Sequence, residues 1–95
     1  MEIVVYMLRC ADGSYYVGNT RKLIEHRVAE HNSGLIDGYT RSRLPVELVY
    51  AEATNILMVA FERERQLKGW SRAKKEALIA GQVGNLAELA SRKKR

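Results

Sequence analysis

The stretch that decides the fold lies at residues 3–19, which read IVVYMLRCADGSYYVGN. Both halves of this stretch are rich in β-branched and aromatic side chains, which favour strands. Between them, Ala-Asp-Gly at positions 11–13 is typical of a turn. The sequence therefore predicts that the chain begins with a β-hairpin.

The length of the hairpin turn decides which side chains share a face. A three-residue turn, with Gly13 in the left-handed conformation, pairs Cys10 with Ser14 and puts Tyr6 and Tyr16 on the same face. A two-residue turn would put the two tyrosines on opposite faces, because strand side chains alternate with a period of two. We favour the three-residue turn.

The rest of the chain alternates helical and extended patterns. Thr20 is a candidate cap for a helix from Arg21 or Lys22 to Asn32, and Ser33-Gly34 would end that helix. The further elements predicted are a loop over 35–44, a strand over 46–53 after Pro45, helices over 56–68 and about 72–80, and a short helix from Asn85. The order β-β-α-β-α-α-α predicts an α+β fold, in which helices flank a small three-stranded, mainly antiparallel sheet.

Length and composition bound the protein class. The 95 residues suit one domain, which we assign to residues 1–80, with a short helix and basic tail over 81–95. A hydrophobic content of 46% with 28% charged residues is typical of a globular domain rather than a membrane or disordered segment. Cys10 is the single cysteine, which excludes an intrachain disulfide or a cysteine zinc cluster. The N-terminus does not resemble a signal peptide, so we expect a cytoplasmic protein.

The charge balance favours a polyanionic partner. A formal net charge of +5 and a sequence pI near 9.6 suit nucleic acid, because lysine and arginine release condensed counterions when they meet phosphate. The alternative is that these basic side chains only solvate the surface. Composition does not decide between the two.

Three ionisable residues fall on faces that should be apolar. On a helical wheel with Leu23 at zero, Arg27 lies near 40° and His31 near 80°, inside the arc that ends with Val28 at about 140°. Glu64 likewise falls within the apolar arc of the later helix. Because burying an unpaired charge is costly, such placements indicate a partner, a metal or a polar cleft.

These residues belong to a larger pattern that resembles the GIY-YIG nuclease superfamily, and in particular its small stand-alone bacterial members. The resemblance covers most of the chain and ends near Ile79. It is carried by Val4-Val5-Tyr6, Tyr16-Val17-Gly18, Arg27, His31-Asn32-Ser33-Gly34, Tyr39-Thr40-Arg41, Leu48-Val49-Tyr50 and the run from Glu64 to Arg72.

The resemblance implies a metal-dependent endonuclease acting on DNA, with structure-directed cleavage in repair or recombination. Glu64 would hold one Mg²⁺ or Mn²⁺, a hard cation that keeps several of its waters. Arg27 would stabilise charge on the phosphate oxygens, and Tyr16 would orient phosphate or water. Tyr6 would position or deprotonate the attacking water; His31 is the competing base, or relays a proton from Tyr6.

Further basic residues are candidates for contact with nucleic acid. These are Arg41, Arg43, Arg72, Lys74 and Lys75. The spacing from Gly18 to Arg27 is one residue longer than is usual in the family, and we expect the extra residue to bulge at the start of the helix. Asn19 receives no role, and Trp70 is assigned to the core.

Other functions compete with nuclease activity. The chain could be a nucleic-acid-binding module that has the fold without catalysis, or a protein-interaction adaptor. Glu64 could also form an ordinary helical ion pair with Lys68, four residues later.

Overall fold

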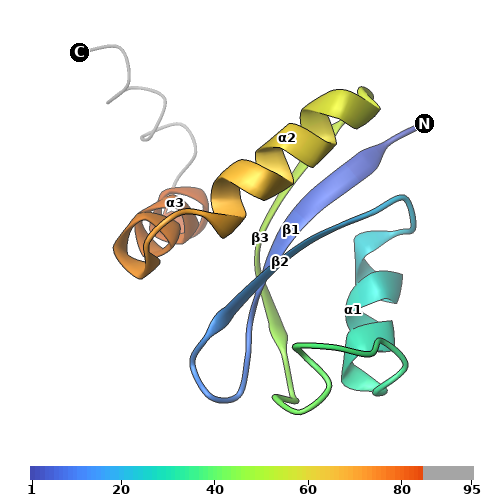
Figure 1. Ribbon diagram of the computed structural model, residues 1–95, viewed down its shortest axis with the longest axis vertical. Helices are drawn as coiled ribbons and strands as arrows, with labels where there is room; N and C mark the ends of the chain where they lie inside the picture. Colours follow the sequence, from blue (N-terminus) through green and yellow to red (C-terminus); the bar gives the residue numbers. More distant parts are fainter. Residues whose placement is uncertain (85–95) are drawn as a thin grey trace.

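The computed structural model describes residues 1–84, which form a three-stranded antiparallel sheet and three helices (Figure 1). The sheet order is β2-β1-β3, so the first strand lies in the centre. The elements are β1 (Ile3–Arg9), β2 (Tyr15–Thr20), α1 (Ile24–Asn32), β3 (Glu47–Thr54), α2 (Leu57–Lys68) and α3 (Arg72–Gly84). None of these helices is long and apolar enough to cross a membrane. The predicted α+β class and the antiparallel sheet are confirmed, while the expected helix from Asn85 lies outside the described residues.

Helices cover both faces of the sheet, as Figure 1 shows, with α1 on one side and the α2–α3 pair on the other. Alternating residues of β1 supply the two cores. Val5 and Met7 pack with Ala60 and Leu67 of α2, whereas Tyr6 belongs to the cluster that Val28 of α1 helps to cover. A strand buried on both faces has no polar alternation, which explains the continuous apolar run of β1.

The hairpin has the register predicted for a three-residue turn. The Cys10 N–H donates to the Ser14 carbonyl over 2.8 Å, and Gly13 adopts a positive φ of 87°. In this register Tyr6 lies opposite Gly18. Tyr6 and Tyr16 therefore share the α1 face, with ring centroids 6.3 Å apart.

The first helix begins later than predicted. It starts at Ile24 rather than at Arg21 or Lys22, and Leu23 precedes it without a capping hydrogen bond from its side chain. The Thr20 hydroxyl instead accepts the Lys22 N–H over 3.0 Å, so it closes a turn before the helix. This turn and the residues up to Leu23 connect β2 to α1, while the bulge of one extra residue stays a prediction.

The other boundaries shift by one to four residues. Strand β3 runs one residue later than predicted, and α2 begins at Leu57 with Ile56 preceding it. The expected cap at Ser71 is confirmed, because its hydroxyl accepts the Lys74 N–H over 3.2 Å. Helix α3 continues beyond residue 80 to Gly84, which corrects its predicted end.

The close approach of Tyr6 to Gly18 gives a stability prediction. A Cβ at Gly18 would lie 2.8 Å from the Tyr6 hydroxyl and 2.9 Å from Tyr16 Cε2. Gly18→Ala should therefore lower the free energy of unfolding by about 1–3 kcal/mol, the usual cost of overpacking, as measured by urea denaturation. Gly69→Ala is the matched control and should change stability little, because its nearest new contact is at 3.6 Å. Equal effects of the two substitutions would contradict this packing.

Candidate active site

The four residues predicted to be catalytic form one cluster on the α1 face of the sheet, and the predicted metal ligand Glu64 lies outside it. Tyr6 lies on the central strand and Tyr16 on the edge strand, while Arg27 and His31 are one turn apart on α1. The Tyr6 hydroxyl is 2.8 Å from His31 Nε2, and Arg27 Nε donates to the same hydroxyl over 3.4 Å. The Tyr16 ring meets the His31 ring edge-on, with centroids 5.3 Å apart.

Burial sets the protonation of the central pair. Both side chains are fully buried. Loss of solvation raises the pKa of Tyr6 and lowers the pKa of His31, and the nearby Arg27 charge lowers the pKa of His31 further. At neutral pH both groups are therefore neutral. Because the Tyr6 hydroxyl oxygen already accepts from Arg27, we assign its own proton to the bond with His31 Nε2, which leaves the ring proton on Nδ1.

The Nδ1 proton has a partner that sequence reasoning missed. Thr40 Oγ1 lies 2.8 Å from His31 Nδ1, and Thr40 is itself buried. The motif Tyr39-Thr40-Arg41 supported the family resemblance, yet nothing in its pattern indicated this contact. The hydrogen bonds thus run from Arg27 through Tyr6 and His31 to Thr40.

The loop that carries Thr40 is held by hydrogen bonds at its two ends, next to α1 and next to β3. The Asn32 amide donates to the Val46 carbonyl over 3.0 Å, and its oxygen accepts the Val46 N–H over 2.7 Å. The Arg43 carbonyl also accepts the Ala11 N–H over 2.9 Å. Asn32 therefore does more than end its helix, because it fixes both ends of the segment between α1 and β3.

Arg27 is directed into the cluster rather than into bulk solvent. Its side chain is 24% exposed, and its guanidinium pairs with Glu30 over 3.2 Å. The hydrogen bond to Tyr6 is the main cause that raises the pKa of Arg27. Lys22 binds the same Glu30 carboxylate over 2.5 Å, so the segment before α1 supplies a second cation to this acid.

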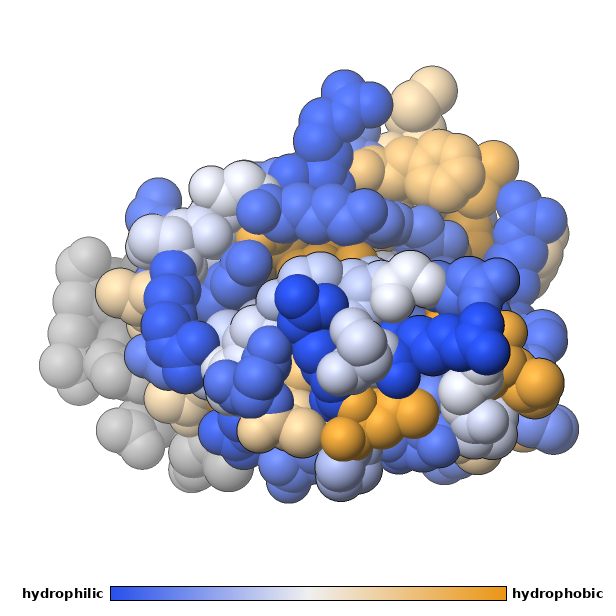
Figure 2. Space-filling model, turned by 60° about the horizontal axis from the view of Figure 1, so that its bottom comes forward, coloured by the Kyte–Doolittle hydropathy of each residue, from blue (hydrophilic) through white to orange (hydrophobic). Residues whose placement is uncertain are grey.

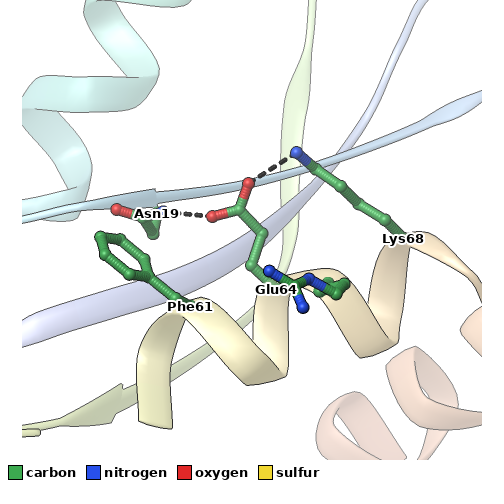
Figure 3. Close-up of a pocket in the computed structure, with 5 residues that line it drawn as sticks. Asn19, Phe61, Glu64 and Lys68 are labelled. Carbon is green, nitrogen blue, oxygen red and sulfur yellow. Dashed lines mark hydrogen bonds and ion pairs between the residues drawn. The ribbon is translucent and has the colours of Figure 1, made fainter. Parts of the chain in front are cut away.

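Glu64 lies in a neighbouring pocket. Its carboxylate accepts a hydrogen bond from the Asn19 amide and pairs with the Lys68 ammonium over 2.6 Å (Figure 3). Only 16% of the Glu64 side chain is exposed, so it faces inward as predicted and also forms the alternative helical ion pair. Asn19, to which sequence reasoning gave no role, is thus a contact of the candidate metal ligand.

The pocket around Glu64 has a volume of about 420 Å³. Its lining residues are Asn19, Phe61, Glu64, Arg65 and Lys68. All but Asn19 lie on α2, and Figure 3 shows the Glu64 carboxylate between Asn19 and Lys68. The pocket therefore combines one acid, two cations, an amide and an aromatic ring.

The buried cluster and the pocket adjoin at the edge strand β2. Gly18 lies opposite Tyr6 on the α1 face, and the next residue, Asn19, faces α2 and Glu64. The Glu64 charge helps to raise the pKa of Tyr6. Within residues 1–84, however, the hydrogen bonds and ion pair of Glu64 go to Asn19 and Lys68, and none reaches the four clustered residues.

The donor set of the pocket suits a hard cation. Among the described residues there is no cluster of three or more histidine, cysteine, aspartate or glutamate side chains that could hold a metal. Glu64 is the acid that the pocket offers, and the Asn19 amide faces it through its nitrogen. Mg²⁺ is commonly held by one or two carboxylates and keeps several waters, so these residues fit such an ion.

Most basic residues predicted to meet nucleic acid are engaged in contacts of the fold. Arg43 pairs with Asp12 over 3.0 Å and lies 3.8 Å above the Tyr39 ring. Arg72 donates to the Gly13 carbonyl over 2.7 Å. Lys74 lies 5.5 Å above the ring of Trp70, which packs against the core as predicted. Arg41 pairs with Asp37, and Lys75 is partly buried.

Arg43 and Arg72 both lie beside the β1–β2 turn, at the end of β2 away from Asn19. Figure 2 turns this lower end of the molecule forward and shows a mostly hydrophilic face with small, separate apolar groups. Contact of these two residues with phosphate stays a prediction, and it concerns a surface distant from the pocket.

The lowered pKa of His31 predicts sensitivity to acid. The ordinary histidine value is 6.5, so the unfolded chain gains a proton near this pH while folded His31 stays neutral. The resulting stability is fully present above about pH 6.5 and is lost as the pH falls through the folded-state pKa. Urea unfolding at several pH values should show this decline, and His31→Gln should flatten it. An unchanged slope in His31→Gln would contradict the assignment.

Thr40 should fix the His31 tautomer. Thr40→Val keeps the shape but leaves the Nδ1–H without its acceptor, which should cost about 1–3 kcal/mol of stability. In ¹⁵N NMR, the His31 ring of the wild type should show the shifts of a single Nδ1-protonated tautomer, and Thr40→Val should lose them. Thr40→Ser keeps the hydroxyl and should retain them; identical spectra for all three proteins would contradict this role.

Comparison with known proteins identifies the family of the chain. Residues 2–77 match the protein family described as "GIY-YIG catalytic domain". A UPF0213 protein of Natronomonas pharaonis is 49% identical over 80 residues, which cover 84% of this chain and 93% of that protein. One from Bacillus pumilus is 46% identical, over 78% of this chain and 74% of that protein.

Solved structures agree with these relatives. The solution NMR structure of a UPF0213 protein from Bacillus halodurans has a TM-score of 0.55 at 40% identity, with 84% of each chain covered. The solution NMR structure of an E. faecalis protein has a TM-score of 0.60 at 32% identity, with 90% of each chain covered. The chain belongs to the GIY-YIG catalytic domain family, within its UPF0213 group.

Proposed function

We propose that the protein is a divalent-metal-dependent endonuclease that hydrolyses phosphodiester bonds in DNA, with structure-directed cleavage in repair or recombination. One observation carries the proposal: the hydrogen-bonded chain of Arg27, Tyr6 and His31 adjoins the pocket of Glu64 at Gly18 and Asn19. In this proposal Arg27 would bind phosphate and His31 would accept a proton, while Glu64 across the edge strand would hold the metal ion. Membership of a catalytic-domain family supports the same function.

Protons would leave the attacking water through the buried pair. Tyr6 is a poor base by itself, because burial raises its pKa. Its hydroxyl is already bonded to the neutral Nε2 of His31. In our proposal Tyr6 takes the water proton while it passes its own proton to His31. The oxygen of the water bonds to phosphorus, and the bond to the 3′-oxygen breaks.

Arg27 and Tyr16 are the partly exposed members of the cluster, so substrate would meet them first. The Arg27 guanidinium would exchange its long hydrogen bond to Tyr6 for a phosphate oxygen, where its fixed fork matches the anion. Tyr16 would orient the phosphate or the water. A metal ion bound at Glu64 would polarise the phosphate and stabilise the leaving oxygen.

A second candidate is a nucleic-acid-binding module without catalysis. The full burial of Tyr6 and His31 favours it, because a closed cluster presents neither group to a substrate. The Lys68 ammonium on Glu64 favours it too, since a cation already compensates this acid. Such a module would bind nucleic acid in a salt-dependent manner and would not cleave it.

Glu64→Gln separates the two functions. It keeps the size of the side chain and removes the charge that would hold the metal, so cleavage of branched, nicked and single-stranded DNA with Mg²⁺ or Mn²⁺ should fall at least about 100-fold, as when a key electrostatic contact is removed. Glu62→Gln, on the exposed surface of the same helix, is the matched control and should cleave normally. Full activity of Glu64→Gln would refute the proposal, and salt-dependent binding without cleavage by the wild type would favour the module.

A further inference from the structure

The pocket contains an aromatic side chain that the proposed reaction does not use. Phe61 lies one turn before Glu64 on α2 and remains 47% exposed. Figure 3 shows its ring at the pocket, on the side of Asn19. An exposed ring beside a candidate catalytic carboxylate has a free face on which a ligand can stack.

The same pocket also contains cations that suit an anionic ligand. Arg65 lines the pocket, and no ion pair involves its guanidinium within the described part of the chain. Lys68 is paired with Glu64 and has 55% of its side chain exposed. An ammonium has three N–H donors, so Lys68 can meet a phosphate while it stays paired with Glu64.

Size and chemistry together indicate the class of ligand. A volume of about 420 Å³ lies within the range of pockets that hold small ligands. A flat ring that stacks on Phe61 and an anion that meets Arg65 and Lys68 are the two parts of a nucleotide. Inside a duplex the faces of a base are already stacked, so only an unpaired nucleotide can offer its base to Phe61.

We propose that this pocket binds an unpaired nucleotide of the substrate, with its base stacked on Phe61 and its phosphate held by Arg65 and Lys68. The inference rests on the proposed function, because it places this nucleotide beside the phosphate that is cleaved. It adds a selection rule: substrates that are unpaired at the cleavage position bind better than continuous duplex.

A protein contact is the competing explanation for the exposed ring. Ile56, Met58 and Val59, near the start of α2, are also exposed apolar residues. None of them lines the pocket around Glu64, whereas Phe61 does. The positive charge of the chain and the two cations at the pocket favour nucleic acid over an apolar protein surface.

The test measures binding without metal or cleavage. A short fluorescein-labelled oligothymidylate and a duplex of the same length are titrated with protein in EDTA, and fluorescence anisotropy reports binding. Phe61→Leu keeps an apolar side chain without the ring, and should weaken single-strand binding about tenfold, as expected for one lost stacking contact, while duplex binding is unchanged. Phe61→Trp should retain the affinity. Met58→Ala, 67% exposed on the same helix and outside the pocket, is the matched control.

The cations are tested by the salt dependence. Arg65→Gln should reduce the slope of log affinity against log salt by about one, as expected for one lost phosphate contact. Arg9→Gln removes the same charge at the hairpin end of β1 and should leave the slope unchanged.

Several results would overturn the inference. These are no measurable single-strand binding by the wild type, equal binding by Phe61→Leu and wild type, equal loss on single strand and duplex, or a change in oligomeric state of Phe61→Leu in analytical ultracentrifugation. Cleavage is assayed separately. If the protein prefers single strands through Phe61 but does not cleave, the nucleotide pocket is supported and the proposed nuclease function is refuted. If it cleaves normally and Phe61→Leu has no effect, the nuclease function is supported and the nucleotide pocket is refuted.

Discussion

The packing of the Tyr6 ring against Gly18 is the constraint on which the site depends. With no side chain at position 18, the phenol reaches over the edge strand to His31 and Arg27. This close approach exists only because the Gly13 turn sets a register in which the two residues face each other. A slip of one residue would turn Tyr6 toward a different neighbour, so the turn, the glycine and the hydrogen bonds of Tyr6 depend on one another.

The candidate site residues lie in two different environments, a buried cluster and an open pocket. On the α1 face, burial favours the neutral forms of Tyr6 and His31, so their hydrogen bond joins two uncharged groups. On the α2 side, Glu64 lies in an open pocket and is paired with Lys68. The edge strand β2 separates the two, with Gly18 on one side and Asn19 on the other.

The parts that sequence could predict are those governed by local rules. Turn chemistry and strand alternation put Tyr6 and Tyr16 on one face, and helical periodicity identified Arg27, His31 and Glu64 as ionisable groups on inward faces. Thr40 and Asn19 could not be predicted, because their contacts join a loop to a helix and a strand to a distant helix. The late start of α1 was not predicted, because a threonine hydroxyl can close a turn as well as cap a helix, and Thr20 closes a turn.

The double hydrogen bond between the Asn32 amide and Val46 lets one side chain imitate a neighbouring strand. Closing the segment between α1 and β3 costs chain entropy, and the Asn32–Val46 hydrogen bonds offset this cost where the segment begins and ends. Within the segment, Thr40 is held by His31. Residues 34–38 lie between these points of attachment. Insertions there would lengthen an already closed loop at small cost and leave the histidine partner in place, which gives the fold a region where its length can diverge without altering its chemistry.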